Sequence, residues 1–147
     1  MRLVLLVGLP GSGKSTWLER NRLPALSSDA VRVLLTGDIA NQTINPLVFR
    51  TLRFLTLARL RAGAEVTYID STALTLWERA PWLRFAARHA CPIEAVFFDV
   101  SVAECRRRNA ARARIVPADV MDKMAAKLAP PTLEEGFTRI VRITDSD

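Results

Sequence analysis

The stretch that decides the fold is GLPGSGKS, residues 8–15, which directly follows the apolar run RLVLLV of residues 2–7. Its spacing fits the pattern G-x-x-x-x-G-K-[ST]. The fixed positions are Gly8, Gly13, Lys14 and Ser15. A buried strand before the motif and a helix after it form the context that a phosphate-binding loop requires. Such a loop turns backbone N–H groups toward phosphate oxygens at a helix N-terminus. The sequence therefore predicts a nucleoside triphosphate site.

The residues of the predicted nucleotide site are expected to contact different parts of the ligand. Lys14 is expected to reach the β- and γ-phosphates of ATP, and Ser15 to give its hydroxyl to Mg²⁺. The residues expected to bind nucleotide here are Gly8, Gly11, Ser12, Gly13, Lys14, Ser15 and Thr16. GTPases, ATPases, transporters and kinases all share this loop, so it does not name the reaction.

The bulk composition is that of an ordinary globular chain. The 147 residues suit one domain, and they are 50% hydrophobic and 24% charged. No apolar run approaches the roughly 20 residues of a membrane span. The apolar part of the N-terminus is only residues 3–7, and a motif stands where a signal peptide would be cleaved. We therefore expect a cytoplasmic protein with no membrane association.

Cysteine and histidine are too sparse for several kinds of site. Cys91 and Cys105 have no metal-binding spacing and are expected to be reduced and packed. His89, the single histidine, is expected near a helix C-terminus, where it would interact with the helix dipole. One histidine and two cysteines without metal-binding spacing disfavour a histidine-based catalytic triad and a zinc site.

The net charge is +6, the pI is near 10.3, and most of the basic residues are arginine. This bias fits forked recognition of phosphate, and it equally fits a GC-rich genome. A basic chain is a hint of a polyanionic partner and no more.

Strand and helix patterns alternate along the chain, which predicts an α/β fold. A parallel five-stranded sheet with helices on both faces is the three-layer arrangement of P-loop kinases. The expected strands are residues 2–7, 25–28, 65–70, 93–100 and 137–143. The expected helices are residues 14–22, 30–36, 47–62, one ending near 89 with Pro81 inside it, 102–109, and one opened by Pro117. We expect Pro81 to delay or kink its helix, and we expect a capping box at Ser101 and Glu104. Residues 1–147 are expected to form a single domain.

Three features favour a kinase. Asp29 and Asp70 follow the second and third strands, so both are expected at the carboxyl edge of the sheet beside the phosphate loop. The segment CRRRNAARAR, residues 105–114, is expected to begin a lid over the nucleotide, spanning about residues 106–128. The chain is too short for the extra elements of motors or transporters, and it lacks an N-K-x-D motif for GTP. Phosphoryl transfer needs a carboxylate, a metal ion and arginines.

Each of these features also has a plainer interpretation. Asp29 could be only the N-cap of the following helix, and Asp70 only a residue of the turn after its strand. About half of the arginine run is expected to lie on a solvated helix face. On the long helix, Arg50, Arg53 and Arg61 fall within about 80° of one face, which fits either a nucleic-acid track or solvent. The tryptophans could stack on bases, although packing is the commoner role.

The chain resembles the 5′-hydroxyl polynucleotide kinase family, the kinase modules of bacterial and phage end-healing enzymes. The resemblance covers nearly the whole chain. It rests on GLPGSGKSTW, on SSDAVR for S-S-D-x-x-R, on NQT at 41–43, on IDST for D-x-T-N, on AVFFDVSVAECRRRNAAR, and on EEGF at 134–137. Ala73 replaces the asparagine of D-x-T-N. Between Arg112 and Arg114 the lid is about one residue shorter than in the family, so the resemblance assigns the lid role to Arg112.

The resemblance implies a role for several side chains. Asp29 would be the general base on the acceptor 5′-hydroxyl, and Arg32 would contact the transferred phosphate or the acceptor's own phosphate. Arg112 would be the lid arginine on the γ-phosphate, Asp70 would lie near Mg²⁺ or its waters, and Arg108 would stack on adenine.

The sequence thus favours ATP-dependent phosphorylation of the 5′-hydroxyl ends of DNA or RNA. Two other interpretations remain open. One is a small-molecule kinase acting on a nucleoside, an antibiotic or a sugar, and the other is a non-catalytic nucleotide switch. The sequence does not identify protein partners.

Overall fold

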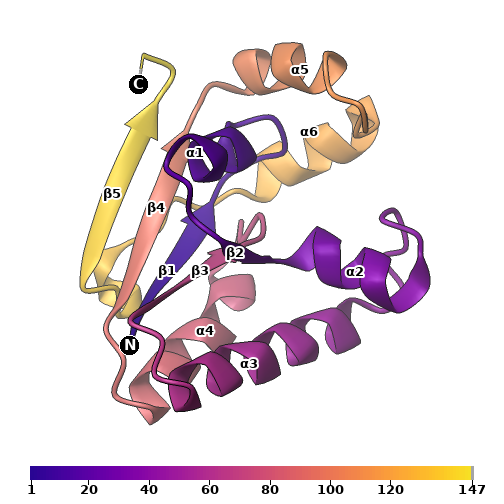
Figure 1. The fold of residues 1–147 in the computed structure, drawn as a ribbon. Coiled ribbons are helices and arrows are strands. Elements are labelled where there is room, and N and C mark those ends of the chain that lie inside the picture. The colour runs from indigo at the N-terminus through magenta and orange to yellow at the C-terminus, as the bar shows by residue number, and fades with distance from the viewer. Residues whose placement is uncertain (147) are drawn as a thin grey trace.

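The computed structural model describes residues 1–146, and it contains one five-stranded parallel sheet (Figure 1). The strands are β1 (Arg2–Val7), β2 (Ala25–Ser27), β3 (Val66–Asp70), β4 (Ile93–Asp99) and β5 (Arg139–Thr144). Their order across the sheet is β2-β3-β1-β4-β5, and every neighbouring pair is parallel. The expected α/β class and five parallel strands are confirmed.

Helices cover both faces of this sheet. They are α1 (Lys14–Arg20), α2 (Ser28–Thr36), α3 (Asn45–Arg61), α4 (Leu76–Arg88), α5 (Val102–Ala110) and α6 (Ala118–Lys127), with a short 3₁₀ turn, η1 (Leu133–Glu135). Figure 1 shows α3 and α4 side by side below the sheet and α1, α5 and α6 above it. None of the helices in residues 1–146 is long and apolar enough to cross a bilayer.

The central strand β1 is apolar on both faces, which explains why helices pack on both faces of the sheet. Leu3, Leu5 and Val7 join a core cluster with α3 and α4. Val4 and Leu6 point the other way and join a cluster with α1. A strand that is buried on both faces has no polar side to alternate with, which is why residues 3–7 are continuously apolar.

A third apolar cluster connects the phosphate loop to the lid. It contains Leu9 of the loop, Leu74 after β3, Cys105 of α5 and Met121 of α6, all of them buried. Cys105 is therefore a packing residue, as expected. The cluster holds α5 and α6 at the carboxyl edge of the sheet, close to the loop.

Several helix ends differ from expectation. The N-cap of α2 is Ser27, whose Oγ accepts from the backbone N–H of Ala30, so Asp29 is not the cap. Helix α3 begins at Asn45 because Pro46 suits a first turn. Helix α4 begins at Leu76, so Pro81 does not delay its start. The side chain of Thr75 caps α4 instead.

The expected capping box at Ser101 forms only in part. Ser101 Oγ accepts from the backbone N–H of Glu104. The Glu104 carboxylate does not reach back to the Ser101 N–H, because it binds Arg107 and Arg108. Hydrogen bonds from these two arginines, Arg107 first, lower the pKa of Glu104 to about 2. The Ser101 N–H donates to Asp145 instead.

A completely buried arginine joins three segments that are far apart in the sequence. Arg79 of α4 has no exposed side-chain surface and forms an ion pair with Glu135, at 2.7 Å between Nε and Oε1. Its Nη1 donates to the carbonyls of Ala73 and Ala129. Arg79 therefore fixes the segment after β3, the end of the lid and the turn before β5. This contact gives a structural reason for the EEGF segment.

We expect Glu135→Ala to destabilise the fold by about 3–5 kcal/mol, because it leaves a buried charge without its partner. Urea unfolding of this variant, compared with that of the exposed neighbour variant Glu134→Ala, measures the difference. The double variant Arg79→Met/Glu135→Leu should recover part of the loss, since an apolar pair leaves no uncompensated charge. Equal stability of the Glu135→Ala and Glu134→Ala variants would contradict this account.

Candidate active site

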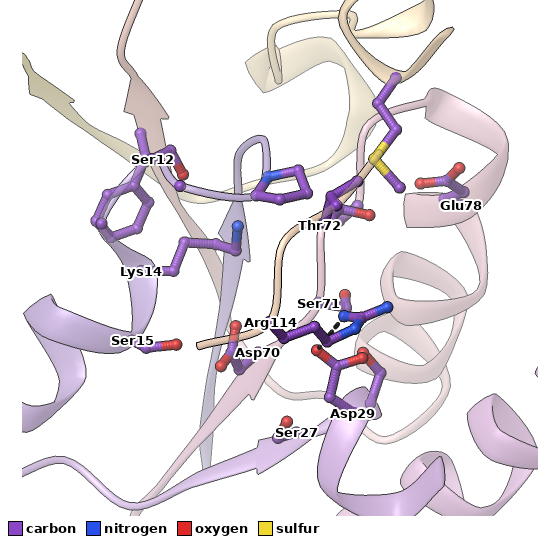
Figure 2. A pocket seen from close by; sticks show the side chains of 18 of the residues that line it. Ser12, Lys14, Ser15, Ser27, Asp29, Asp70, Ser71, Thr72, Glu78 and Arg114 are labelled. Atoms are coloured by element: carbon purple, nitrogen blue, oxygen red, sulfur yellow. Dashed lines mark ion pairs between the residues drawn. The ribbon is translucent and has the colours of Figure 1, made fainter. Parts of the chain in front are cut away.

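A large cleft of about 1570 Å³ opens at the carboxyl edge of the sheet. Its walls are the phosphate loop, the first turn of α2, the residues after β3, the N-terminal half of α3 and the lid. The strand order places β3 between β1 and β2. Accordingly, Asp70 lies between the Lys14 side and the Asp29 side of the cleft (Figure 2). All of the residues predicted for the site line this cleft except Gly8.

The phosphate loop is pressed against helix α5. A Cβ on Gly11 would lie 2.5 Å from the Cys105 carbonyl oxygen, a distance that no side chain tolerates. Gly13 has φ of 100°, the left-handed conformation that favours glycine. Gly8 lies underneath the loop, where its N–H donates to the Thr72 carbonyl.

Lys14 is buried and folded back onto its own loop. Its Nζ donates to the carbonyls of Gly8 at 2.8 Å and Leu9 at 2.9 Å. Burial lowers the pKa of Lys14 to about 8, against the opposing charge of Asp70 and with a further contribution from Arg112. Burial also raises the pKa of Asp70, and the charge of Lys14 opposes this effect. Lys14, Asp70 and Arg112 thus form one electrostatic cluster.

Asp29 stands at the other side of the cleft between two arginines. Its Oδ1 accepts from Arg32 Nη1 at 2.7 Å, and its Oδ2 lies 3.7 Å from Arg114 Nη1 (dashed in Figure 2). Arg32 is almost completely buried, and its Nη2 donates to Asn45 at the start of α3. Asn45 in turn donates to Gln42. The carboxylate is therefore held in position by α2, α3 and the lid.

The arginines of the lid divide into two groups. Arg106 forms an ion pair with Asp122 and Arg107 binds Glu104, and both side chains are largely exposed. Arg108 donates to the Ser12 carbonyl of the phosphate loop at 3.3 Å. Arg112 and Arg114 line the cleft. The expectation that about half of the run is solvated agrees with this division.

Two polar atoms beside the phosphate loop are buried and have no hydrogen-bond partner among residues 1–146. They are Ser12 Oγ and Arg112 Nη1, and Arg32 Nε on the opposite wall is a third. Buried polar groups are normally satisfied, so these donors fit an anionic ligand. Residues 1–146 hold no cluster of three or more metal-ligating side chains. Ser15 and Asp70 both line the cleft, and Mg²⁺ commonly binds through one or two such oxygen groups together with substrate phosphates.

Sequence reasoning missed Asn45 as a residue of the cleft, and it left the settings of the tryptophans and of Ala73 open. Asn45 was expected in a loop, although Pro46 signals the first turn of a helix. Trp77 lines the cleft and is 85% exposed, whereas Trp82 is buried and Trp17 packs edge-on against Tyr68 and Phe98. Ala73, which replaces the family asparagine, has φ of 48°, a left-handed conformation that asparagine adopts more readily than alanine.

The profile of a family described as an AAA domain matches residues 3–131. The chain belongs to this family. A curated relative of this AAA-domain protein is a bifunctional polynucleotide phosphatase/kinase of Schizosaccharomyces pombe. It is 25% identical over 148 residues, which cover 96% of the chain and 33% of the relative. The chain thus spans about a third of that relative's length. The match confirms the resemblance to polynucleotide kinases that the sequence motifs indicated.

Solved structures confirm the P-loop kinase fold. The structure of a Pnkp1/Rnl/Hen1 RNA repair complex matches with a TM-score of 0.72 and 21% identity, covering 86% of this chain and 43% of that one. An unliganded sugar kinase from Janibacter sp. HTCC2649 matches with a TM-score of 0.69 and 20% identity, covering 100% and 87%. At these identities the likeness concerns the fold alone. The AAA-domain protein therefore has the fold of P-loop kinases.

The pKa of Lys14 predicts how nucleotide affinity depends on pH. Below about pH 8 the lysine is charged before nucleotide binds, and above it the lysine must take up a proton to face phosphate. Affinity for a non-hydrolysable ATP analogue should therefore fall as pH rises, approaching about tenfold per pH unit well above the pKa. Calorimetry from about pH 7 to about pH 9.5 measures this slope.

Lys14→Met serves as the control, because it removes the titrating group. Its affinity should be weaker at every pH, with a flatter slope. A wild-type affinity that stays constant across this range would show that Lys14 does not titrate in the cleft.

Proposed function

We propose that this chain is a kinase that transfers the γ-phosphoryl group of ATP to the 5′-hydroxyl end of a polynucleotide, DNA or RNA. The observation that carries the proposal is the position of Asp29. This carboxylate lies in the same cleft as the phosphate loop and is held by Arg32 and Arg114. The name of the Schizosaccharomyces pombe relative supports the choice of acceptor.

In this proposal Asp29 acts as the general base. A carboxylate oxygen of Asp29 accepts the proton of the acceptor hydroxyl as the new bond forms between the acceptor oxygen and the γ-phosphorus. The bond between the γ-phosphorus and its bridging oxygen breaks, and ADP leaves with that electron pair. Arg32 and Asn45 keep the carboxylate oriented toward the cleft.

The other side chains stabilise the transferred charge. Lys14 exchanges its two loop carbonyls for the β- and γ-phosphates, and Arg112 uses its unpartnered Nη1 on the γ-phosphate. Arg108, held against the Ser12 carbonyl, lies on the side of the loop proposed for adenine. Ser15 and Asp70 would hold Mg²⁺, which when bound neutralises charge on the phosphate oxygens.

A small-molecule kinase is the second candidate, and the likeness to the Janibacter sugar kinase supports it. Its acceptor would also be a hydroxyl facing Asp29. The net charge of +6 and the size of the cleft favour the polynucleotide, since a polyanion with several phosphates gains most from clustered arginines. A non-catalytic switch would need neither Asp29 nor its arginines.

An acceptor screen separates these candidates. ATP labelled on the γ-phosphate is offered with Mg²⁺ to a 5′-hydroxyl oligonucleotide, to the same oligonucleotide with a 5′-phosphate, to a panel of nucleosides and sugars, and to no acceptor. We expect label on the 5′-hydroxyl oligonucleotide and none on its 5′-phosphorylated control. Label on small alcohols alone would favour the second candidate, and nucleotide binding without transfer to any acceptor would favour the switch.

We expect Asp29→Asn to lower the transfer rate by about 10²–10⁴, the usual value of a positioned base. Asparagine keeps an oxygen for Arg32 but cannot take the hydroxyl proton. ATP affinity should stay close to wild type, and single-turnover assays at saturating ATP isolate the chemical step.

Ser27→Ala provides the matched control on the same helix, because Ser27 is the actual cap of α2. It should cost about 1 kcal/mol of stability while leaving the chemical step largely intact. If Asp29→Asn transferred phosphate at nearly the wild-type rate, the base would lie elsewhere.

A further inference from the structure

A second groove lies between α3 and α4 and has a volume of about 720 Å³. Arg53, Leu57 and Arg61 line it from α3 at spacings of one helical turn, together with Phe54. The α4 side contributes Pro81, Arg84, Phe85 and Arg88. Figure 1 shows how these two helices run alongside each other below the sheet. Among the described residues, 1–146, no acidic side chain lines the groove.

The groove adjoins the active-site cleft, because the two share lining residues. Arg53 and Pro81 line both of them. Helix α3 begins at Asn45, which contacts Arg32 beside Asp29, and it leads away from the cleft to Arg61. A nucleic-acid strand whose 5′ end lies at Asp29 can therefore continue along α3 without reversing direction.

The arginines of this region have no partners within residues 1–146. They form neither a hydrogen bond nor an ion pair there; they are Arg50, Arg53, Arg61, Arg84 and Arg88. Arg59 on the same helix behaves differently, because it donates to Thr67 Oγ1 and to the Val66 carbonyl. Burial, and then the charges of Arg50 and Arg84, lower the pKa of Arg53. Such a cluster of like charges is complementary to an anion.

The dimensions and the aromatic residues favour a single strand over a duplex. Arg53 and Arg61 are about 12 Å apart along the helix axis at 1.5 Å per residue. A stacked strand carries one phosphate per roughly 3.4 Å, so this distance spans more than one phosphate. Phe54 is 69% exposed at the groove, and Trp77 is exposed in the adjoining cleft. Unpaired bases stack on such aromatic rings, whereas the bases of a duplex are already stacked.

We propose that the α3–α4 groove binds the single-stranded part of the acceptor, on the 3′ side of the reacting nucleotide. This proposal rests on the proposed function. Arg53, Arg61, Arg84 and Arg88 hold successive backbone phosphates, and Phe54 stacks on a base. The kinase would then select a 5′-hydroxyl end that is followed by several unpaired nucleotides.

The test uses Arg61→Ala/Arg88→Ala, because both residues lie in the groove and outside the cleft. The matched control is Arg22→Ala/Arg139→Ala, which removes the same charge from two exposed arginines that line neither the groove nor the cleft. Fluorescence anisotropy with a labelled single-stranded oligonucleotide measures binding without any need for transfer. KM for the oligonucleotide and for a mononucleoside 3′-phosphate is measured in parallel.

We expect the groove variant, and not the control, to lose oligonucleotide affinity. Its slope of log affinity against log salt should fall by about 1.4, which is two contacts at about 0.7 each. KM should rise for the oligonucleotide and stay unchanged for the mononucleoside 3′-phosphate. Phe54→Ala should lower affinity by about fivefold or more with no change in salt slope, since stacking releases no counterions.

Three results would overturn the proposal. One is an equal oligonucleotide affinity of the groove and control variants. Another is an equal rise in KM for the oligonucleotide and for the mononucleoside 3′-phosphate. A third is an equal loss of affinity for blunt duplex ends in the groove variant, which would show that the groove does not prefer a single strand. Failure of the wild type to phosphorylate any oligonucleotide would count against the proposed function, and the anisotropy comparison would still decide whether the groove binds nucleic acid.

Discussion

The close contact between the phosphate loop and helix α5 is the constraint on which the rest of the site depends. The loop leaves β1, which is buried on both faces, so its position is fixed by the centre of the sheet. At Gly11 the loop backbone touches the Cys105 carbonyl, and only glycine permits that approach. This contact sets where α5 starts, and α5 sets where the lid carries Arg108, Arg112 and Arg114. One steric condition therefore positions both the nucleotide loop and the cations that face it.

Asp29 and the lid are linked by charge. Arg32 approaches the carboxylate from its own helix, and Arg114 approaches it from the lid. In the proposed reaction, the acceptor side of the cleft is therefore sensitive to the lid position as well as to the local turn. A nucleotide phosphate that attracts Arg112, as proposed, also affects the segment that carries Arg114, two residues away. We therefore expect the two proposed substrates to influence each other's binding through this short piece of backbone.

The local features of this protein were predictable from the sequence, and the distant contacts were not. The phosphate loop, the strands and the carboxyl-edge position of Asp29 and Asp70 follow from motifs and from the rules of parallel sheets. Asp29 was a possible cap of α2, but serine caps helices equally well, and the geometry selects Ser27. The Arg79–Glu135 pair joins residues 56 apart, which no periodicity reveals. The exposure of Trp77 depends on how α4 packs. The arginines of α3 and α4 that have no partner within residues 1–146 line a common groove only because the two helices lie side by side.

The edges of the sheet have a consequence for how copies of this chain behave at high concentration. A parallel sheet that ends in open strands offers unpaired peptide groups to a second molecule. Here β2 has only three residues, too short a template for a stable ladder. The other edge, β5, carries Arg139 and Arg142 with their side chains exposed to solvent. Arg142 is paired with Asp99, so two copies that approached through β5 would chiefly bring their Arg139 charges together, which disfavours growth of the sheet by strand addition.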